Sequence, residues 1–114
     1  MIDVREYLDP HGRSYYAVWF DRLNPQAAAK VATALTRLAN GNMSNVKGVG
    51  SGVFEYRIDF GPGYRIYFGK DGERLVILLG GGIKKRQQQD IAAALARWQE
   101  YKRRKQENGH GSHS

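Results

Sequence analysis

Two runs of alternating apolar and polar residues, joined by a Gly-Pro-Gly turn, constrain the fold of this chain most strongly. In VFEYRIDFGPGYRIYF, residues 53–68, every second residue is aromatic or aliphatic on both sides of the turn. A period of two places alternate side chains on opposite faces of a β-strand. The stretch therefore predicts an antiparallel hairpin with one apolar and one polar face.

The register of this hairpin depends on the length of its turn. If the Gly-Pro-Gly sequence is a three-residue loop, Asp59 lies opposite Arg65 and Arg57 lies opposite Tyr67. These four polar side chains then share one face. We expect that face to be open, because helices from the N-terminal part of the chain must cover the apolar face.

The segments before the hairpin predict a strand and two helices. Residues 2–7 alternate like an edge strand, and aromatic residues recur at helical spacing within residues 9–23. A second helix is clearer, because Asn24 can cap it, Pro25 suits its first position and Gly41 follows its end. Its expected buried stripe is Ala28, Val31, Leu35 and Leu38, with Lys30, Thr33 and Arg37 facing away.

The other segments predict a loop, a central strand and a final helix. Residues 41–52 are glycine-rich and polar, which indicates a loop. RLVILL, residues 74–79, is typical of a strand buried on both faces, and three glycines at 80–82 then lead out of the sheet. The apolar stripe of the final helix is Ile91, Ala94, Leu95, Trp98 and Tyr101.

These elements predict an α+β fold. An N-terminal strand and two helices pack on a mainly antiparallel four-stranded sheet, and a C-terminal helix follows. The length of 114 residues and the hydrophobic content of 41% suit one domain, which we place at residues 1–102. Residues 103–114 lack a packing pattern and predict a disordered basic tail, whose end, GHGSHS, is typical of an expression tag.

Composition also excludes several classes of protein. The chain has no cysteine, and two of its three histidines lie in the tail, so the sequence predicts no metal and no cofactor. No apolar run reaches the roughly 18 to 20 residues that cross a bilayer. The N-terminus also lacks the pattern of a signal peptide. We therefore expect a cytoplasmic protein without a membrane partner.

Positive charge is concentrated near the C-terminus. The formal net charge is +7, with +2 from residues 1–83, +6 from residues 84–105 and the balance from Glu107. A basic segment attracts nucleic acid, an anionic membrane or an acidic protein partner. A solvated helix face with a charged tail has the same composition, so composition alone does not choose between these alternatives.

Basic residues from separate segments are predicted to converge beside the hairpin. Arg57 and Arg65 lie on its polar face, and Lys84–Arg86 follow the central strand at the same end of the sheet. Such a cluster can bind phosphates and stabilise charge at phosphorus, while Tyr67 or an arginine stacks on bases. The alternative is a set of ordinary cross-strand pairs on a wet surface, worth about 0.2 to 1 kcal/mol each.

The glycine-rich segments do not match known nucleotide-binding motifs. GVGSG at 48–52 lacks a preceding parallel strand and a following helix, and the three glycines at 80–82 lack the spacing of a P-loop. No Ser-His-Asp or Cys-His set can be assembled either.

The order of the elements, with VFEYRIDFGPGYRIYF at the centre and LVILLGGGIKKRQQQDI after it, resembles the RelE/ParE superfamily of toxins. The likeness is greatest to the HigB-like addiction module killer proteins and covers about residues 1–100. It implies a RelE-like fold and the toxin of a type II toxin–antitoxin system. It also implies a small helix-turn-helix antitoxin as partner, operator DNA binding by the complex, and ribosome-dependent cleavage of mRNA that inhibits translation and growth.

The resemblance also implies roles for individual residues. Arg65 corresponds to the arginine of the family's Gly-Tyr-Arg element, Arg57 to a basic residue on the preceding strand, and Lys84 or Lys85 to the basic pair after the last strand. In the implied metal-independent reaction, the mRNA 2′-hydroxyl attacks the neighbouring phosphate. The arginines hold that phosphate, and one of the lysines helps to remove the proton or neutralise charge. The residues expected to bind RNA are Tyr67, Arg86, Arg97 and Lys102.

Two other functions stay open at this point. A ParE-like toxin that poisons DNA gyrase has the same fold, so the fold cannot decide between the two activities. The basic cluster beside Arg57 and Arg65 favours RNA cleavage. A nucleic-acid-binding protein without catalytic activity would bind RNA in a salt-sensitive manner even after Arg65→Ala.

Overall fold

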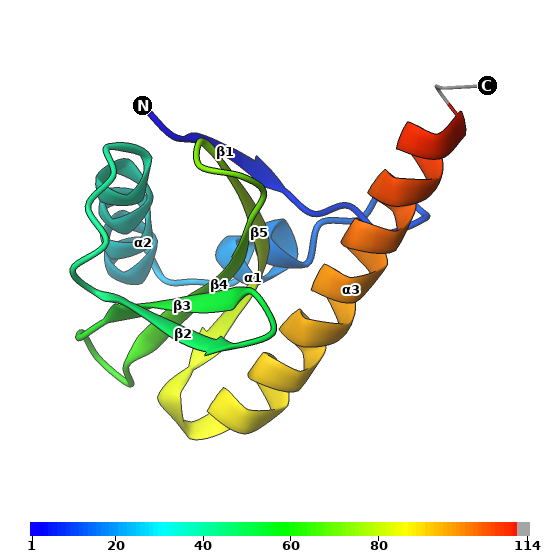
Figure 1. The fold of residues 1–114 in the computed structure, drawn as a ribbon. Coiled ribbons are helices and arrows are strands. Elements are labelled where there is room, and N and C mark those ends of the chain that lie inside the picture. Colours follow the sequence, from blue (N-terminus) through cyan, green and yellow to red (C-terminus); the bar gives the residue numbers. More distant parts are fainter. Residues whose placement is uncertain (112–114) are drawn as a thin grey trace.

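The computed structural model describes the backbone of residues 1–111 and the side chains of residues 1–108. Over this range a five-stranded sheet has the order β1-β5-β4-β3-β2, and three α-helices pack on it (Figure 1). β1 is parallel to β5, and all other neighbouring strands are antiparallel. The mixed α+β class and the C-terminal helix are confirmed. The predicted number of four strands is wrong.

The N-terminal part of the chain forms an edge strand and a short helix, as predicted. β1 (Asp3–Glu6) lies at one edge of the sheet. α1 (Tyr15–Asp21) begins after Ser14, whose hydroxyl accepts a hydrogen bond from the amide of Ala17 at 3.0 Å. This cap satisfies one of the amide groups that have no partner within the first turn of a helix.

α2 (Pro25–Ala39) has the ends that the sequence predicted. Asn24 caps it through a 2.8 Å hydrogen bond from the amide of Ala27, and Gly41 follows it at a positive φ of 84°. Its buried face is rotated slightly from the predicted one. The fully buried residues are Ala27, Val31, Ala34 and Leu38, whereas Ala28 and Leu35 are half-buried.

The extra strand is β2 (Val46–Gly50), which lies within the segment predicted to be a loop. It pairs with β3 (Val53–Ile58) at the edge of the sheet, with a register shift between Gly48 and Gly50. An edge strand has one neighbour and can be short and polar, so its sequence carries a weak pattern. The correction to five strands follows from this element.

β3 and β4 (Tyr64–Lys70) form the predicted hairpin with a different register. Arg57 pairs with Arg65 and Glu55 pairs with Tyr67. The prediction that Arg57 lies opposite Tyr67 is therefore wrong. The side chains still lie on the predicted faces, because the register differs by two residues, which is the period of a strand.

The difference in register comes from a longer hairpin loop. Ile58 pairs with Tyr64, so residues 59–63 form the loop, and Asp59 does not lie opposite Arg65 as predicted. The amide of Phe60 donates to the carbonyl of Ile58, and that of Gly63 donates to the carbonyl of Phe60, both at 3.0 Å. Because these two bonds hold residues 59–63 in the loop, Phe60 does not pair with Tyr64, as a three-residue turn would require.

β5 (Leu75–Ile83) lies inside the sheet, between β1 and β4, and it continues through the three glycines instead of ending at Leu79 as predicted. Each glycine leaves room for a side chain from another element. A Cβ atom at Gly81 would collide with the Trp19 ring on the α1 side of the sheet. On the opposite side, Cβ atoms at Gly80 and Gly82 would meet Arg97 and Asp90.

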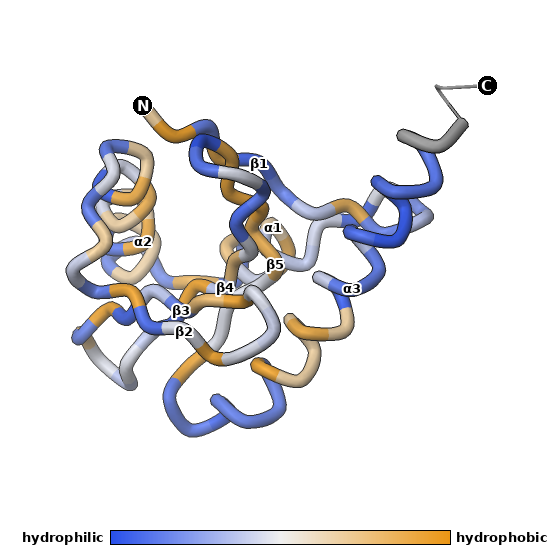
Figure 2. Tube along the Cα trace, in the orientation of Figure 1, coloured by the Kyte–Doolittle hydropathy of each residue, from blue (hydrophilic) through white to orange (hydrophobic). Residues whose placement is uncertain are grey.

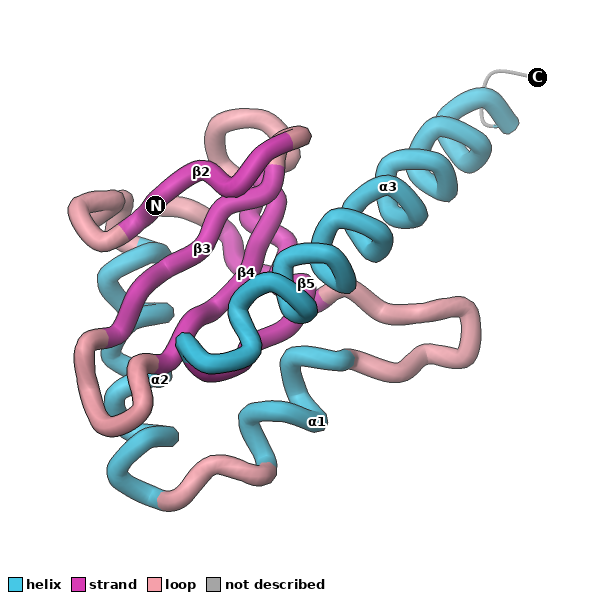
Figure 3. The backbone as a smooth tube through the Cα atoms, turned by 90° about the horizontal axis from the view of Figure 1, so that it is seen from below, coloured by secondary structure: helices cyan, strands magenta, loops and turns pink. Residues whose placement is uncertain are grey.

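α3 (Gln87–Gly111) follows the 3-10 turn η1 (Lys84–Arg86) and crosses the face of the sheet opposite α2 (Figure 3). Its predicted apolar stripe is confirmed, with Ala94 and Trp98 fully buried. Figure 2 shows hydrophobic residues where α3 crosses the sheet and hydrophilic residues where it projects beyond. Among the described residues, no helix is long and apolar enough to cross a membrane.

The C-terminal segment is helical where it is described. α3 continues past residue 103 to residue 111, within the segment for which the sequence predicted a disordered tail. Salt bridges one turn apart, Arg103 to Glu107 and Arg104 to Glu100, support this part of the helix. Residues 112–114, the end of the segment predicted to be a tag, lie outside the described residues. The prediction of one domain over residues 1–102 stays a prediction.

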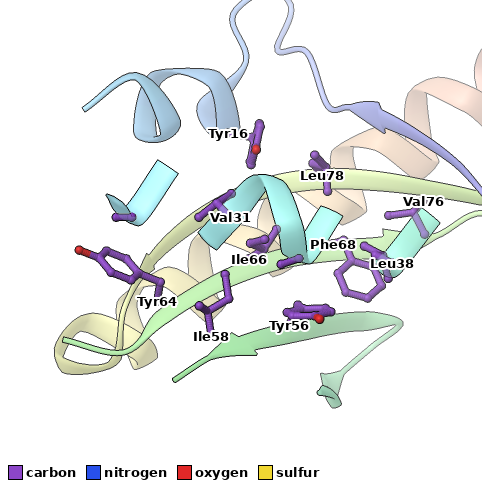
Figure 4. Close-up of a cluster of buried hydrophobic side chains, with 12 residues drawn as sticks. Tyr16, Val31, Leu38, Tyr56, Ile58, Tyr64, Ile66, Phe68, Val76 and Leu78 are labelled. Carbon is purple, nitrogen blue, oxygen red and sulfur yellow. The ribbon is translucent and has the colours of Figure 1, made fainter. Parts of the chain in front are cut away.

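Hydrophobic side chains pack on both faces of the sheet. One core lies between the sheet and the helices α1 and α2 and includes Tyr16, Val31 and Phe68 (Figure 4). The other lies under α3 and includes Tyr67 and Trp98. The prediction that the polar face of the hairpin is open is therefore wrong, because α3 covers most of it.

Candidate functional site

A fully buried carboxylate, Glu55, organises the polar side chains of the hairpin. Its Oε1 atom accepts hydrogen bonds from Arg57 Nε at 2.8 Å and from Arg65 Nη1 at 3.2 Å. Gln87 Nε2, at the start of α3, donates to both carboxylate oxygens at 3.2 and 3.1 Å. Burial of a carboxylate is tolerated when it is paired and hydrogen-bonded, and these three partners meet both conditions.

Glu55 holds the two arginines in different environments. The Arg65 side chain is 8% exposed and the Arg57 side chain is 46% exposed, whereas that of Glu55 is 0% exposed. Arg65 is therefore held rigidly, and Arg57 reaches the surface. Sequence analysis missed this role for Glu55, because the predicted register placed Asp59 beside Arg65. Gln87 carries no charge or motif that marks it in the sequence.

Arg57, Arg65 and Lys84 line one surface cavity of about 300 Å³, which we call the arginine cavity. It lies where β3, β4 and η1 meet. Three predicted site residues from separate segments are thus brought together. The other lining residues are Ile58, Asp59, Gly63 and Tyr64.

The Gly-Pro-Gly turn positions Lys84 in this cavity. The Lys84 amide donates to the carbonyl of Gly63 at 2.8 Å, and a Cβ atom at Gly63 would lie 3.3 Å from the Lys84 Cβ. Gly63 also has a φ of 80°, which L-residues with a side chain rarely adopt. Glycine at this position therefore allows both the turn and the close approach of the lysine.

The other two basic residues of η1 lie outside the arginine cavity. Lys85 and Arg86 are exposed and do not line this cavity. The motif left Lys84 and Lys85 as alternatives for one role. Of these two, the structure brings Lys84 to Arg57 and Arg65.

Tyr67 and Asp90 lie deeper, between the sheet and α3. Tyr67 is 1% exposed, so it does not present a surface for base stacking as predicted. Burial raises the pKa of Tyr67, and the nearby Glu55 and Asp90 carboxylates add to this effect. The Asp90 carboxylate occupies the space that a side chain at Gly82 would fill. Burial raises the pKa of Asp90, and the cations Arg86 and Arg97 oppose that shift.

Three atoms in this polar layer are buried without a hydrogen-bond partner among the described residues: Arg65 Nε, the Tyr67 hydroxyl and Asp90 Oδ2. An unsatisfied buried polar atom costs about 1 to 3 kcal/mol. Such costs are uncommon in native proteins, and perturbed polar groups gather at functional sites. Their concentration beside the arginine cavity supports a functional role for this part of the sheet.

Arg97 and Lys102, expected to bind RNA, lie elsewhere on α3. Arg97 Nη1 donates to the carbonyl of Leu79 at 2.9 Å, and its guanidinium lies 3.7 Å from the centre of the Tyr15 ring. Burial lowers the pKa of Arg97. These contacts fasten α3 to β5 and α1. Lys102 is exposed, with its ammonium 5.8 Å from the centre of the Trp98 ring.

The chemistry of the arginine cavity is that of an anion site. Its polar groups are two guanidiniums, one ammonium and the Asp59 carboxylate. Guanidinium groups match the geometry of phosphate and carboxylate oxygens. In the part of the chain that the structure describes, no three metal-binding side chains lie close enough together to hold an ion.

Fold and site together define a small α+β protein with a basic cavity at the end of a β-hairpin. The chain matches the family described as "Phage derived protein Gp49-like (DUF891)" over residues 18–100. It therefore belongs to the Gp49-like family of phage-derived proteins, which is associated with toxin–antitoxin systems.

A relative in Haemophilus influenzae (strain ATCC 51907 / DSM 11121 / KW20 / Rd) is similar in sequence. It is described as an uncharacterized protein and is 45% identical over 83 residues. The match covers 72% of this chain and 84% of the relative. The match thus spans most of both proteins.

Proposed function

We propose that this chain is the toxin of a type II toxin–antitoxin pair, of HigB-like type within the RelE/ParE superfamily, and that it cleaves mRNA on the ribosome. The convergence of Arg57, Arg65 and Lys84 on one cavity carries the proposal. The family's association with toxin–antitoxin systems supports the toxin assignment.

The arginine cavity holds the phosphate that is cut. Arg57 uses its Nε for Glu55, and no described residue takes a hydrogen bond from its terminal nitrogens. Those nitrogens contact phosphate oxygens, while Lys84 supplies a second positive charge from the other side of the hairpin loop. Arg65 is the buried charge behind them, held in place by Glu55. Fixed cations of this kind stabilise the charge that develops at phosphorus in the transition state.

The reaction is an internal transfer of the phosphate within RNA. The 2′-hydroxyl oxygen forms a bond to phosphorus and the bond from phosphorus to the 5′-oxygen breaks, leaving a 2′,3′-cyclic phosphate and a 5′-hydroxyl. The carboxylate in this cavity, Asp59, accepts the proton of the 2′-hydroxyl. The Lys84 ammonium gives a proton to the departing 5′-oxygen. Binding on the ribosome supplies the alignment of the 2′-hydroxyl with the phosphate.

The test is cleavage of an mRNA in a translating extract, followed by mapping of the new 5′ ends. Arg57→Ala and Lys84→Ala change exposed side chains and should lower the cleavage rate about 100-fold, the scale of removing one transition-state contact. Asp59→Asn should slow cleavage similarly without weakening RNA binding, because it removes a negative charge. Lys85→Ala removes a neighbouring charge outside the cavity and should reduce the rate less than about threefold.

Two results would contradict this function. Equal cleavage rates for Lys84→Ala and Lys85→Ala would show that cleavage does not depend on the arginine cavity. Intact mRNA together with arrested DNA supercoiling in a parallel gyrase assay would instead assign the chain to the ParE-like poisons.

The proposal also defines partners and location. The toxin acts in the cytoplasm, where ribosomes translate, and a small helix-turn-helix antitoxin neutralises it; the complex of the two binds operator DNA. Growth arrest on expression of the chain, relieved by co-expression of an adjacent helix-turn-helix gene, is the expected result. Arrest that no neighbouring gene relieves would count against the toxin–antitoxin assignment.

A further inference from the structure

A second basic cavity adjoins the arginine cavity on the α2 side of the hairpin. It has a volume of about 210 Å³, and we call it the α2 cavity. It shares Arg57, Ile58 and Asp59 with the arginine cavity, so the two cavities lie next to each other at the end of β3. Its other lining residues are Lys30, Thr33, Ala34, Arg37, Asn45, Tyr56 and Phe60.

The cations of the α2 cavity are available to a ligand. Lys30 and Arg37 are exposed residues of α2 that line this cavity beside the hairpin. Among residues 1–108, neither forms a salt bridge, in contrast to Arg57, which is paired with Glu55. An ammonium and a guanidinium without acidic partners attract phosphate from solution.

The α2 cavity also contains an aromatic ring. Phe60 lies in the hairpin loop and is half-buried, and the Lys30 ammonium lies 5.3 Å from the centre of its ring. A cation over a ring face occupies the position that a stacked base takes in RNA complexes. Asn45 and Asp59, also on the wall, can hydrogen-bond to base or ribose edges.

We propose that the α2 cavity binds the nucleotide next to the scissile phosphate in single-stranded RNA. This inference rests on the proposed function and adds a second subsite to it. Lys30 and Arg37 bind the phosphate of that nucleotide, and its base stacks on Phe60 in place of the Lys30 ammonium. Asp59 lies between the two subsites, where its carboxylate accepts hydrogen bonds but repels phosphate.

An RNA strand fits these observations better than an acidic peptide. The α2 cavity combines exposed cations with a ring suited to stacking, and it adjoins the cavity proposed to hold the reacting phosphate. A glutamate-rich segment would use the cations but not the ring. An octaglutamate peptide therefore serves as the competing probe.

The test measures binding of two uncleavable 2′-O-methyl RNAs by fluorescence anisotropy between 0.05 and 0.2 M salt. A dinucleotide has one phosphate, which the arginine cavity holds, so it lacks the phosphate that Lys30 and Arg37 would bind, whereas an octanucleotide has phosphates for both cavities. K30A/R37A should weaken octanucleotide binding about tenfold and lower the salt slope by about 0.7, the value for one lost phosphate contact on a single strand. Dinucleotide affinity should stay within about twofold of the native value.

The matched control is R13A/R74A, which removes the same charge from two exposed positions outside both cavities. It should change octanucleotide affinity less than about threefold, as expected from long-range attraction alone. Equal losses for the two double variants, or no loss for K30A/R37A, would overturn the inference. Binding of octaglutamate as tight as that of the octanucleotide, and equally sensitive to K30A/R37A, would overturn it in favour of an acidic partner.

Stacking on Phe60 has a separate readout. Phe60→Leu keeps an apolar side chain beside Tyr64 and should weaken octanucleotide binding at least about fivefold, because one base loses its aromatic platform. Its melting temperature shows whether the variant is folded. Unchanged affinity in a folded variant would contradict stacking at this position.

The subsite and the cleavage activity fail in different ways. If the native protein cuts mRNA and K30A/R37A cuts it at the native rate with native octanucleotide affinity, the activity holds and the subsite is wrong. If mRNA stays intact but octanucleotide binding depends on Lys30 and Arg37, the subsite holds and the proposed cleavage is wrong.

Discussion

At the scale of single residues, Glu55 determines how the hairpin presents its positive charge. Without this carboxylate, the nearly buried Arg65 guanidinium would have no acidic partner among the described residues. With it, Arg65 is neutralised and fixed, and Arg57 is directed toward the cavity by its Nε contact. Glu55 is thus a positioning residue for the cations that face a ligand.

Replacement of Glu55 by glutamine tests this role. Glu55→Gln keeps the shape but leaves Arg65 as a buried charge without an anion, so the free energy of unfolding at pH 7 should fall by about 2 to 4 kcal/mol. Urea titration measures the change. Glu73→Gln removes the same charge from an exposed turn residue and should alter stability by less than about 0.5 kcal/mol. A similar small effect for both variants would show that the buried pairs are energetically unimportant.

Asp90 gives a pH-dependent prediction. Because burial raises the pKa of Asp90 above its ordinary 3.8, the folded protein binds this proton more tightly than the unfolded chain. Stability is therefore lost as the pH rises above that value. Asp90→Asn removes the titration, so its stability relative to the native chain should increase as the pH rises above about 3.8. The gain should reach at most about 1 kcal/mol, because the group is partly screened by solvent.

Urea midpoints of both proteins at pH 3.5, 5 and 7 measure this difference. A stability difference that is the same at all three pH values would mean that the Asp90 carboxylate carries no burial cost.

At the scale of elements, the three glycines of β5 set how closely the helices approach the sheet. Gly81 receives Trp19 from α1, and Gly82 receives Asp90 from α3. Side chains on a strand alternate between faces, so consecutive glycines create room on both sides. The sequence suggested that the glycines lead out of the sheet, whereas they allow β5 to remain in it between two helices.

Alanine at these positions should be costly. Gly81→Ala and Gly82→Ala should each destabilise the protein by about 1 to 3 kcal/mol, because a Cβ atom overlaps a packed side chain. Asp90→Ala should restore part of the loss in Gly82→Ala, since the two groups compete for one space. Thermal or urea unfolding measures both effects.

Gly48 in β2 provides the control. A Cβ atom there would lie 3.8 Å from the Phe54 ring, which is an ordinary contact, so Gly48→Ala should change stability by less than about 0.5 kcal/mol. Equal stability of Gly81→Ala and Gly48→Ala would contradict the close packing at β5.

At the scale of the whole molecule, one sheet serves two hydrophobic cores. β4 supplies Phe68 to the core under α1 and α2 and Tyr67 to the core under α3. Each tryptophan reports on one face, since Trp19 packs over Gly81 and Trp98 packs over Gly69. Because the strands are shared, loss of either core removes the support of the other.

The two faces should therefore unfold in one transition. In Trp19→Phe and Trp98→Phe, the remaining tryptophan reports on one face by fluorescence, and circular dichroism reports on the whole chain. For each variant, the fluorescence and dichroism midpoints in urea should coincide. In Trp19→Phe, a fluorescence midpoint at lower urea than the dichroism midpoint would show that α3 detaches before the sheet unfolds.

At this scale, part of the positive charge of the C-terminal segment is used in contacts within the protein. Arg104 pairs with Glu100, Lys105 with Asp71, and Arg97 binds the carbonyl of Leu79. The contacts of Lys105 and Arg97 hold α3 against the rest of the molecule. The net charge of this segment is therefore larger than the charge that it offers to an anionic partner. Of its cations, Lys84 is the one that lines the arginine cavity.

The local pattern of the sequence was sufficient to predict β1, the caps of α2, the hairpin with its two different faces and the apolar stripe of α3. Each of these depends on neighbours within a few residues, through strand alternation, helix periodicity or capping. The convergence of Arg57, Arg65 and Lys84 was also predictable, because their strands end at the same side of the sheet. Their biochemical roles stay predictions.

Tertiary structure alone decided the remaining features. The pairing of Glu55 with both arginines required the actual register, and burial of Tyr67 required the path of α3 across the hairpin. β2 became a strand because β3 offered it an edge, not because of its own pattern. A sequence pattern specifies which face a side chain occupies, whereas hydrogen bonds and packing between distant segments specify what lies opposite it.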